Sequence, residues 1–419
     1  MIATALLYKE TGFNWMPVIP ENWETKRAKA IFQERSIKGF PDEPLLAASQ
    51  KQGVVLKEML EQRSMEAVQN FESFKLVEKD DFVISLRSFE GGIELAYYRG
   101  IISPVYSIFY FRENKHNRDF FKYLFKSRMF IQELNVYKKG IRDGQSISYS
   151  EFANIYLPVP PKAEQDEIVQ YIKAQEEKIN RFIEKKQRFI ELLKEQRQSV
   201  IDLAITKGTN PNANLIEIGV DWIGKFPQHW QFRKLKFCVS LNSNEIDESE
   251  ISDEVFKIAL ENIDNWTGKF IDTGNPQFEG KGVPFKAGDV LFNKLRPYLA
   301  KAFIAKSSGF CVGELLVLSP NEDFFTSEFL FQRLMTSDFI DIVNSSTYGA
   351  KMPRASWNFI GNLKIPIPPI EEQKQIVEHI KIETANIDTA ISKAEREIEL
   401  IREYKEAMIS EAVMGNIKF

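Results

Sequence analysis

The strongest hydrophobic pattern in this chain is an apolar stripe at helical spacing that occurs twice. The first stripe runs over residues 168–204 and the second over 376–412, and each member of the first has a counterpart 208 positions later. The 36 residues from first to last member correspond to ten turns at 3.6 residues per turn, the period of a straight α-helix. The stripes therefore predict two long helices with little supercoiling, whose buried faces contain Ile168, Ile172, Ile179, Ile183, Ile190 and Leu193, and Ile376, Ile380, Ile387, Ile391, Ile398 and Ile401.

Residues at both ends of the stripes agree with helix boundaries. Pro161 and Pro369 stand just before them, where proline is tolerated, and Gly208 and Gly415 stand just after them, where glycine ends a helix. A helix of about 44 residues is roughly 65 Å long, so it cannot bury its whole stripe on one compact domain. We expect the two helices to pair along their length, antiparallel if a pseudo-two-fold axis relates the two halves of the chain. A coiled coil between separate chains is the alternative.

The remaining segments predict mixed α and β structure. Apolar residues at helical spacing predict helices at 119–134 and 327–343. Short apolar segments rich in β-branched and aromatic residues predict strands at 81–86, 105–111, 289–295 and 314–320. Turn-rich loops follow at 138–148 and 348–356. The predicted fold class is α+β: two repeated mixed domains separated by a long antiparallel helix pair, which forms a coiled-coil-like spacer.

Repeated words show that the whole chain is duplicated. LPVPP at 157–161 matches IPIPP at 365–369, and EQDEIVQYIK matches EQKQIVEHIK directly after them. Near the start of each half, GFNWMPVIPENW and GVDWIGKFPQHW share a glycine, a proline and two tryptophans. A repeat of this length is far longer than a solenoid repeat, so each half is one globular domain followed by one long helix. The predicted boundaries are 1–156, 157–209, 210–364 and 365–419.

Composition narrows the class of protein. Hydrophobic residues make up 43% of the 419 positions and include 33 Phe, which is enough to build sizeable cores. Two cysteines and three histidines argue against a disulfide framework and against a metal site. The chain has no apolar run of membrane-spanning length and its start does not resemble a signal peptide, so we expect a cytoplasmic protein with no membrane partner.

Catalytic motifs do not emerge from the sequence. The chain contains no G-x-S-x-G, H-E-x-x-H or Cys-x-x-Cys, and GVDWIGKF at 219–226 lacks the Ser or Thr of a phosphate-binding loop. The net charge of −4, from 55 basic and 59 acidic residues, does not by itself indicate a nucleic-acid binder. We expect no catalytic residues and interpret the chain as a binding and organising protein.

The repeated words resemble those of a known family. The two E-Q-x-x-I-V words after Pro-Pro, the paired tryptophan words and FVISLRSFEGGI at 82–93 resemble the specificity subunits of type I restriction-modification systems. The resemblance covers essentially the whole chain. It implies that residues 1–156 and 210–364 are target recognition domains, each reading one half of a bipartite, gapped DNA site. It also implies that the helices at 157–209 and 365–419 form the spacer and dock methyltransferase subunits.

The same resemblance implies partners and cofactors. Double-stranded DNA and two methyltransferase subunits are the expected partners, with restriction subunits as a further candidate. The chain is then not an enzyme by itself: adenine-N6 methylation and cleavage belong to partner subunits. It binds no cofactor of its own, and S-adenosylmethionine, ATP and Mg are expected on those subunits. Their phosphate contacts would account for the near-neutral charge of this chain.

Candidate DNA-binding residues are basic, amide and aromatic side chains in corresponding places of the two halves. In the first half they precede Gly91 and Gly92, which we expect to allow close approach to a phosphate, or lie in the later loop: Arg87, Ser88, Phe89, Lys138, Lys139, Arg142 and Gln145. In the second half they are Lys294, Arg296, Tyr298, Tyr348, Lys351 and Arg354. For each one, an ordinary solvated surface side chain is the alternative.

Two other functions stay open from the residues alone. The chain is a helical scaffold or oligomerisation protein whose globular domains bind protein rather than DNA, or it is a self-sufficient NTPase or nuclease. Salt-sensitive binding to one bipartite duplex distinguishes a DNA reader from both.

Overall fold

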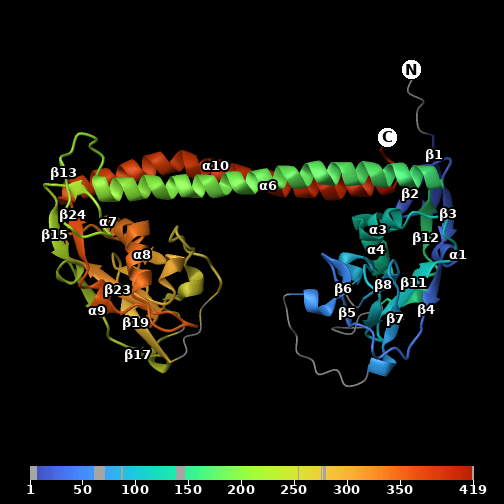
Figure 1. Cartoon of the computed structure of the whole chain (residues 1–419), viewed down its shortest axis with the longest axis horizontal. Coiled ribbons are helices and arrows are strands. Elements are labelled where there is room, and N and C mark those ends of the chain that lie inside the picture. Colours follow the sequence, from blue (N-terminus) through green and yellow to red (C-terminus); the bar gives the residue numbers. More distant parts are fainter. Residues whose placement is uncertain are drawn as a thin grey trace, which may run out of the picture. The chain divides into compact units, whose positions relative to one another are not determined.

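The computed structural model describes residues 7–60, 71–85, 88–137, 147–252, 254–274, 276 and 280–417, with only the backbone described at residue 89. The described chain forms two units (Figure 1). The first unit consists of residues 1–186 and 396–419, and the second of residues 187–395. Both long helices contribute to both units, because each unit takes one part of each helix.

The first unit is built on an antiparallel four-stranded sheet in the order β4-β11-β8-β9. Helices α3 and α4 pack their aromatic side chains against it, and Phe32, Phe82 and Phe109 lie at the centre of the core. The elements are β1 (Tyr8–Phe13), β2 (Met16–Pro20), β3 (Glu24–Arg27), α1 (Ala28–Ile31), β4 (Phe32–Arg35), β5 (Leu46–Ser49), β6 (Gly53–Leu56), β7 (Lys75–Val77), β8 (Phe82–Ile84), α2 (Ser88–Gly91), β9 (Glu94–Leu95), β10 (Gly100–Ile102), β11 (Ser107–Phe111), α3 (Arg118–Lys126), α4 (Arg128–Val136), α5 (Tyr149–Phe152), β12 (Tyr156–Val159) and the first part of α6 (Lys162–Lys207).

The second unit repeats this sheet as β16-β23-β20-β21 and adds a second four-stranded sheet, β17-β19-β22-β18, with its own core. Its elements are β13 (Leu215–Ile216), β14 (Phe226–Pro227), β15 (Gln231–Lys234), β16 (Val239–Asn242), β17 (Ile246–Asp247), β18 (Lys257–Ile258), β19 (Lys281–Phe285), β20 (Val290–Asn293), β21 (Ala302–Ile304), β22 (Gly309–Val312), β23 (Leu315–Pro320), α7 (Ser327–Leu334), α8 (Ser337–Ser345), α9 (Trp357–Ile360), β24 (Lys364–Ile367) and the first part of α10 (Ile370–Val413).

The predicted fold class, mixed domains with a long antiparallel helix pair, is confirmed. In the first unit, Glu176 and Lys186 of α6 pair with Lys405 and Glu397 of α10, so residue numbers rise along one helix as they fall along the other. In the second unit, Arg197 Nε lies 2.8 Å from Asp388 Oδ1. The helices end as expected at glycines with positive φ, 74° at Gly208 and 75° at Gly415.

The stripe residues lie between the helices and against the sheets. Within the first unit, Ile168 and Ile172 are fully buried in the same core as Met408 and Ala412. Within the second, Ile376 and Ile380 share a core with Ile201, Ala204 and Ile205. The other members of the predicted stripe are buried or half-buried: Ile179, Ile183, Ile190, Leu193, Ile387, Ile391, Ile398 and Ile401.

Two details of the structure differ from the prediction. The helical segments at 119–134 and 327–343 are each two helices, because Ser127 caps the start of α4 and Thr336 precedes α8 with its hydroxyl bonded to the carbonyl of Arg333. The Pro-rich segments at 157–161 and 365–369 do more than connect each domain to its long helix. They form strands β12 and β24, which pair antiparallel with β3 and β15, the strands that follow the repeated tryptophan words.

Candidate nucleic-acid interface

Two loops that lie far apart in the sequence meet in the second unit. One continues from β20 through residues 294–300, and the other spans 348–356. The backbone N–H of Arg296 donates to the carbonyl of Pro353 at 2.7 Å, and that of Ala355 donates to the carbonyl of Lys294 at 2.9 Å. These bonds bring together the two groups of candidate residues that the sequence placed in the second half.

A surface cleft of about 310 Å³ opens beside these loops. Its lining includes three of the candidates, Lys294, Tyr348 and Arg354, and two polar side chains of the neighbouring β16 end, Asn242 and Ser243. Tyr348 is 63% exposed, so its ring is accessible to a ligand. The cleft therefore combines a lysine ammonium, an arginine guanidinium, an aromatic ring and an amide, which are the kinds of group that read base edges and stack on bases.

The guanidinium of Arg354 is held in one orientation by Glu314. Nη2 donates to Oε1 at 2.8 Å and Nε donates to the same oxygen at 3.1 Å. This hydrogen bond and the charge of Glu314 raise the pKa of Arg354. Because Glu314 engages one edge of the planar group, the remaining N–H donors keep a fixed direction, as bidentate recognition of a base or phosphate requires.

The other candidates of the second half lie on the surface near the cleft. Arg296, Tyr298 and Lys351 are exposed, and Tyr298 is 47% accessible. The turn that carries Arg296 is fixed by the buried side chain of Asn293, whose Nδ2 donates to the carbonyls of Leu295 and Arg296. Arg296 has a φ of 51°, an uncommon conformation for a residue with a side chain.

In the first unit, most of the candidates are not described. Arg87, Lys138, Lys139, Arg142 and Gln145 lie outside the described residues, and so does the side chain of Phe89. Ser88 is 1% exposed, and its Oγ accepts a hydrogen bond from the backbone N–H of Ser85 at 2.8 Å. Its hydroxyl therefore holds the turn after β8 and is not presented at the surface.

Protein atoms occupy the space beside Gly91 and Gly92, the residues at which we expected close approach to a phosphate. A Cβ on Gly91 would lie 2.7 Å from Gln50 Cγ, and one on Gly92, whose φ is 80°, would overlap the carbonyl oxygen of Phe125. Lys126 of α3 also bonds to this loop, because its Nζ donates to the carbonyl of Gly91 at 2.8 Å and pairs with the buried Glu94. Gly92 therefore lets helix α3 approach the loop closely, and Gly91 leaves room for Gln50.

Glu314 is the site residue that the sequence did not reveal. A search for basic and aromatic groups passes over an acidic residue, and the 40 positions between Glu314 and Arg354 hide their contact. In the described part of the chain, no three His, Cys, Asp or Glu side chains lie together so as to hold a metal ion. A helix long and apolar enough to cross a membrane is also not found among those residues.

Comparisons with known proteins agree with the duplication. Residues 20–192 and 227–400 each match the family described as "Type I restriction modification DNA specificity domain". The chain is 25% identical to the type I restriction enzyme MjaVIII specificity subunit of Methanocaldococcus jannaschii, over 100% of this chain and 99% of that protein. It is also 25% identical to the EcoDI specificity subunit of Escherichia coli, but this match spans 38% of the chain and only 36% of that protein.

A solved structure supports the fold. A chain from a study of complex assembly and conformational transition of the type I R-M system superimposes with a TM-score of 0.61 at 16% identity, over 95% of this chain and 99% of that one.

Proposed function

Because the chain belongs to the type I restriction modification DNA specificity family, we propose that it reads a bipartite, gapped site in double-stranded DNA with its two globular domains. Family membership makes it a specificity component, whose relatives are named specificity subunits of restriction enzymes. On this proposal each target recognition domain reads one half-site. The paired helices set the distance between half-sites and dock the subunits that carry the chemistry.

The cleft of the second unit is the observation that carries the proposal for DNA. Arg354, fixed by Glu314, is suited to donate two parallel hydrogen bonds to the O6 and N7 atoms of a guanine in the major groove. Tyr348 and Lys294 line the same cleft and supply stacking and phosphate contact. An arginine held by a carboxylate gains directional selectivity from its fixed fork, which a freely rotating surface cation does not have.

Exposed apolar side chains on the long helices support docking of partner proteins. In the first unit, Phe182 of α6 is 38% exposed, and Leu400 and Tyr404 of α10 are 47% and 54% exposed. Aromatic side chains such as Phe182 and Tyr404 are enriched in the buried centres of protein interfaces. The proposed occupants are two methyltransferase subunits, joined by restriction subunits in a complex that also cleaves DNA.

We propose that this chain binds no cofactor and that S-adenosylmethionine, ATP and Mg belong to the partner subunits. The net charge of −4 is compatible with DNA binding if the partners contribute much of the phosphate contact. This gives a direct expectation: DNA binding by the complex should be much tighter than binding by this chain alone.

Single-molecule modification sequencing tests the proposal. The DNA comes from cells that express this chain with its methyltransferase subunit, and from matched cells that lack only this chain. A gapped bipartite motif carrying N6-methyladenine, lost in the second strain, is the expected result and supplies both half-sites. Methylation that is unchanged without this chain would contradict the proposal and favour a scaffold.

A second experiment tests the role of the helices as a spacer. Inserting four residues, about one helical turn, at corresponding levels of α6 and α10 should change the number of base pairs between half-sites and leave both half-sites unchanged. Altered half-sites would show that the helices do more than set a distance.

A further inference from the structure

A buried glutamine fastens the start of α6 to the first target recognition domain. Gln165 is 1% exposed, and its Oε1 accepts a hydrogen bond from the backbone N–H of Asn117 at 2.8 Å. Its Nε2 donates to the carbonyl of Pro160 at 2.8 Å and contacts His116 Nδ1 at 3.4 Å. Asn117 is the N-cap of α3, so one side chain joins α6, the end of β12 and the start of α3.

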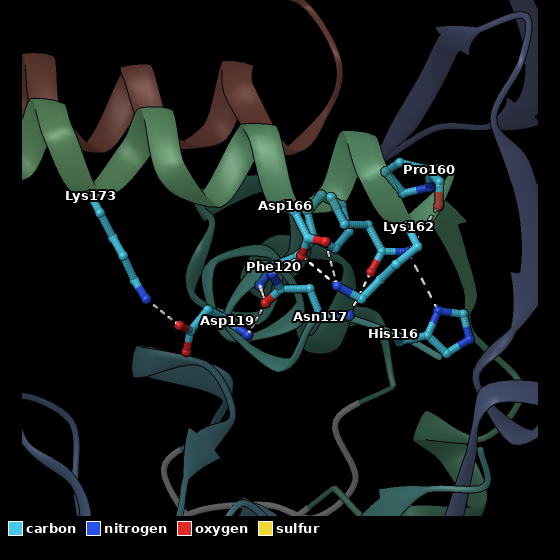
Figure 2. A network of polar contacts seen from close by, with 9 residues as sticks. His116, Asn117, Asp119, Phe120, Pro160, Lys162, Asp166 and Lys173 are labelled. Carbon is cyan, nitrogen blue, oxygen red and sulfur yellow. Dashed lines mark hydrogen bonds and ion pairs between the residues drawn. The ribbon is translucent and has the colours of Figure 1, made fainter. Parts of the chain in front are cut away.

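Charged side chains surround this junction. Figure 2 shows Asn117 Nδ2 donating to Asp166 Oδ1, at 2.6 Å, while Lys162 pairs with the same carboxylate. About two turns further along α6, Lys173 pairs with Asp119 of α3. These contacts are exposed and contribute little to stability, whereas the glutamine at their centre is shielded from water.

The second unit contains the same junction at the start of α10. Gln373, 208 positions after Gln165, is 0% exposed. Its Oε1 accepts from the backbone N–H of Thr326, the N-cap of α7, at 3.0 Å. Its Nε2 donates to the carbonyls of Pro368 and Phe324 at 2.9 and 2.7 Å.

Only a neutral amide of this length matches all of these neighbours. At Gln373 the side chain must accept one bond and donate two, and glutamine can do both. Glutamate would place acceptor oxygens against the carbonyls of Pro368 and Phe324. Methionine, of similar size, would remove the partner of these carbonyls and of the N–H of Thr326, and the Pro368 carbonyl lies in a buried contact.

These hydrogen bonds fix direction in a way that the apolar core cannot. Next to each glutamine, Ile168 and Ile172, or Ile376 and Ile380, supply the buried area that holds domain and helix together. Hydrophobic attraction is non-directional, so a core alone tolerates small rotations between the packed elements. A hydrogen bond weakens steeply as its angle departs from linear, so three of them on one planar amide restrict such rotations.

We propose that Gln165 and Gln373 are positioning residues that fix each target recognition domain on its spacer helix and so make the complex selective for one spacer length. The inference rests on the proposed function, and it adds the cause of spacer selectivity. Adding one base pair between half-sites rotates one of them by about a tenth of a helical turn. A domain held rigidly cannot follow that rotation, whereas a domain held only by its core can follow part of it.

The test compares Gln165→Met and Gln373→Met with wild type, each as the full chain in complex with its methyltransferase subunits. Dissociation constants are measured for duplexes whose half-sites are separated by the natural spacer or by one base pair fewer or more. We expect the preference of the wild-type complex for the natural spacer to fall at least about threefold in both variants. Discrimination against base substitutions within each half-site should stay unchanged, which general damage to a domain would not allow.

Gln170→Met and Gln375→Met are matched controls, because these glutamines lie on the same helices and are exposed. They should keep the wild-type spacer preference. Unchanged preference in the Gln165 and Gln373 variants, an equal fall in the controls, or a parallel loss of base discrimination would each overturn the inference. A wild-type complex that binds gapped duplexes no better than unrelated DNA would instead refute the proposed function itself.

A milder pair of variants covers the case in which methionine prevents folding. Gln165→Asn and Gln373→Asn keep the amide but shorten it by one methylene, so the same bonds lengthen. They should show the same selective loss of spacer preference. In hydrogen exchange, the amides of Asn117 and Thr326 should exchange faster in these variants than in wild type, and unchanged protection would count against the proposed bonds.

Discussion

Each of the two units contains a four-stranded sheet of the same order, and the units differ in how completely a second sheet forms beside it. The antiparallel order β4-β11-β8-β9 of the first unit returns as β16-β23-β20-β21 in the second. Beside it, the described residues of the first unit pair β5 with β6 and β7 with β10 and form single bridges such as Lys38–Lys75 and the parallel Leu45–Ile101, whereas the second unit has the continuous sheet β17-β19-β22-β18. The cleft that carries the candidate residues is lined by the shared sheet, through Asn242 of β16 and Leu316 of β23, and by Val283 of the second sheet. The duplicated sheet therefore forms part of the cleft wall, and the second sheet completes it.

The same turn is held differently in the two units. Asp81 and Asp289, 208 positions apart, each accept a hydrogen bond from the backbone N–H three residues earlier. Asp81 also forms a buried bidentate pair with Arg35, at 2.6 and 3.2 Å, whereas Asp289 accepts from the hydroxyl of Ser319. The first unit thus holds this turn with an ion pair, and the second unit holds it with a neutral hydroxyl.

The largest expected effect comes from breaking that ion pair. Asp81→Ala leaves Arg35 poorly solvated and without its carboxylate, so we expect a loss of about 3–5 kcal/mol in the stability of the first unit. Asp289→Ala removes only hydrogen bonds and should cost the second unit about 1–3 kcal/mol. Hydrogen exchange in increasing urea, followed separately in β8 and β20, measures both. Equal losses would show that the ion pair is not the distinguishing feature.

The next effect concerns the cleft and assumes the proposed function. Arg354→Lys replaces a planar fork by a single ammonium, so discrimination at one base pair of the second half-site should fall by about 1–3 kcal/mol. Glu314→Gln should weaken the same discrimination, while Lys351→Gln should lower affinity similarly for all sequences. Competition binding with single-base substitutions in each half-site tests this. Any change at the first half-site would contradict the assignment of one domain to each half.

The corresponding tryptophans provide a smaller comparison. Trp230 Nε1 donates to Glu372 at 3.1 Å, whereas Trp23 Nε1 is buried without a hydrogen-bond partner among the described residues. Trp230→Phe should therefore destabilise its unit by about 1 kcal/mol more than Trp23→Phe does. Denaturation of the two variants, again resolved by hydrogen exchange, measures the difference. If packing alone determined these losses of stability, Trp23→Phe would instead destabilise its unit more than Trp230→Phe does.

The smallest effect is a pH dependence confined to the first unit. Burial, and then the charges of Lys115 and Lys26, lower the pKa of His116, whose Nδ1 faces the donor Nε2 of Gln165. Because the folded pKa is lowered, this contribution to stability is complete above the unfolded value of about 6.5 and is lost as the pH falls below it. On acidification, the protection of the Asn117 amide relative to its intrinsic exchange rate should fall, whereas the protection of the Thr326 amide should stay constant. In His116→Phe the difference should vanish.

The sequence predicted the parts of the fold that depend on regular, repeated patterns. Ten turns of apolar residues at a 3.6-residue period predict a long helix, and two copies with one offset predict their pairing. A single residue within a periodic run is a weaker signal, so the breaks at Ser127 and Thr336 were missed. The pairing of β3 with β12 was also missed, because partner choice between short strands depends on contacts far apart in the sequence.

The same limit applies to the site. The sequence marked Lys294 and Arg354 as candidates at corresponding places of the two halves but did not predict that their loops meet, as the structure shows they do. The role of Glu314 depends on its distance to Arg354 in the fold, which no local pattern encodes. Gln165 and Gln373 belong to the repeated sequence segments, but only their burial and their three partners distinguish them from ordinary surface glutamines.

The pairing of β3 with β12, and of β15 with β24, has an evolutionary consequence. In each unit these strands lie side by side, so the chain leaves the scaffold and returns to it through neighbouring positions. A gene segment that encodes the intervening residues can then be replaced by recombination while the junctions at both of its ends keep their geometry. On the proposed function, new DNA targets would arise in this way by shuffling whole segments, without the slow accumulation of compatible point mutations.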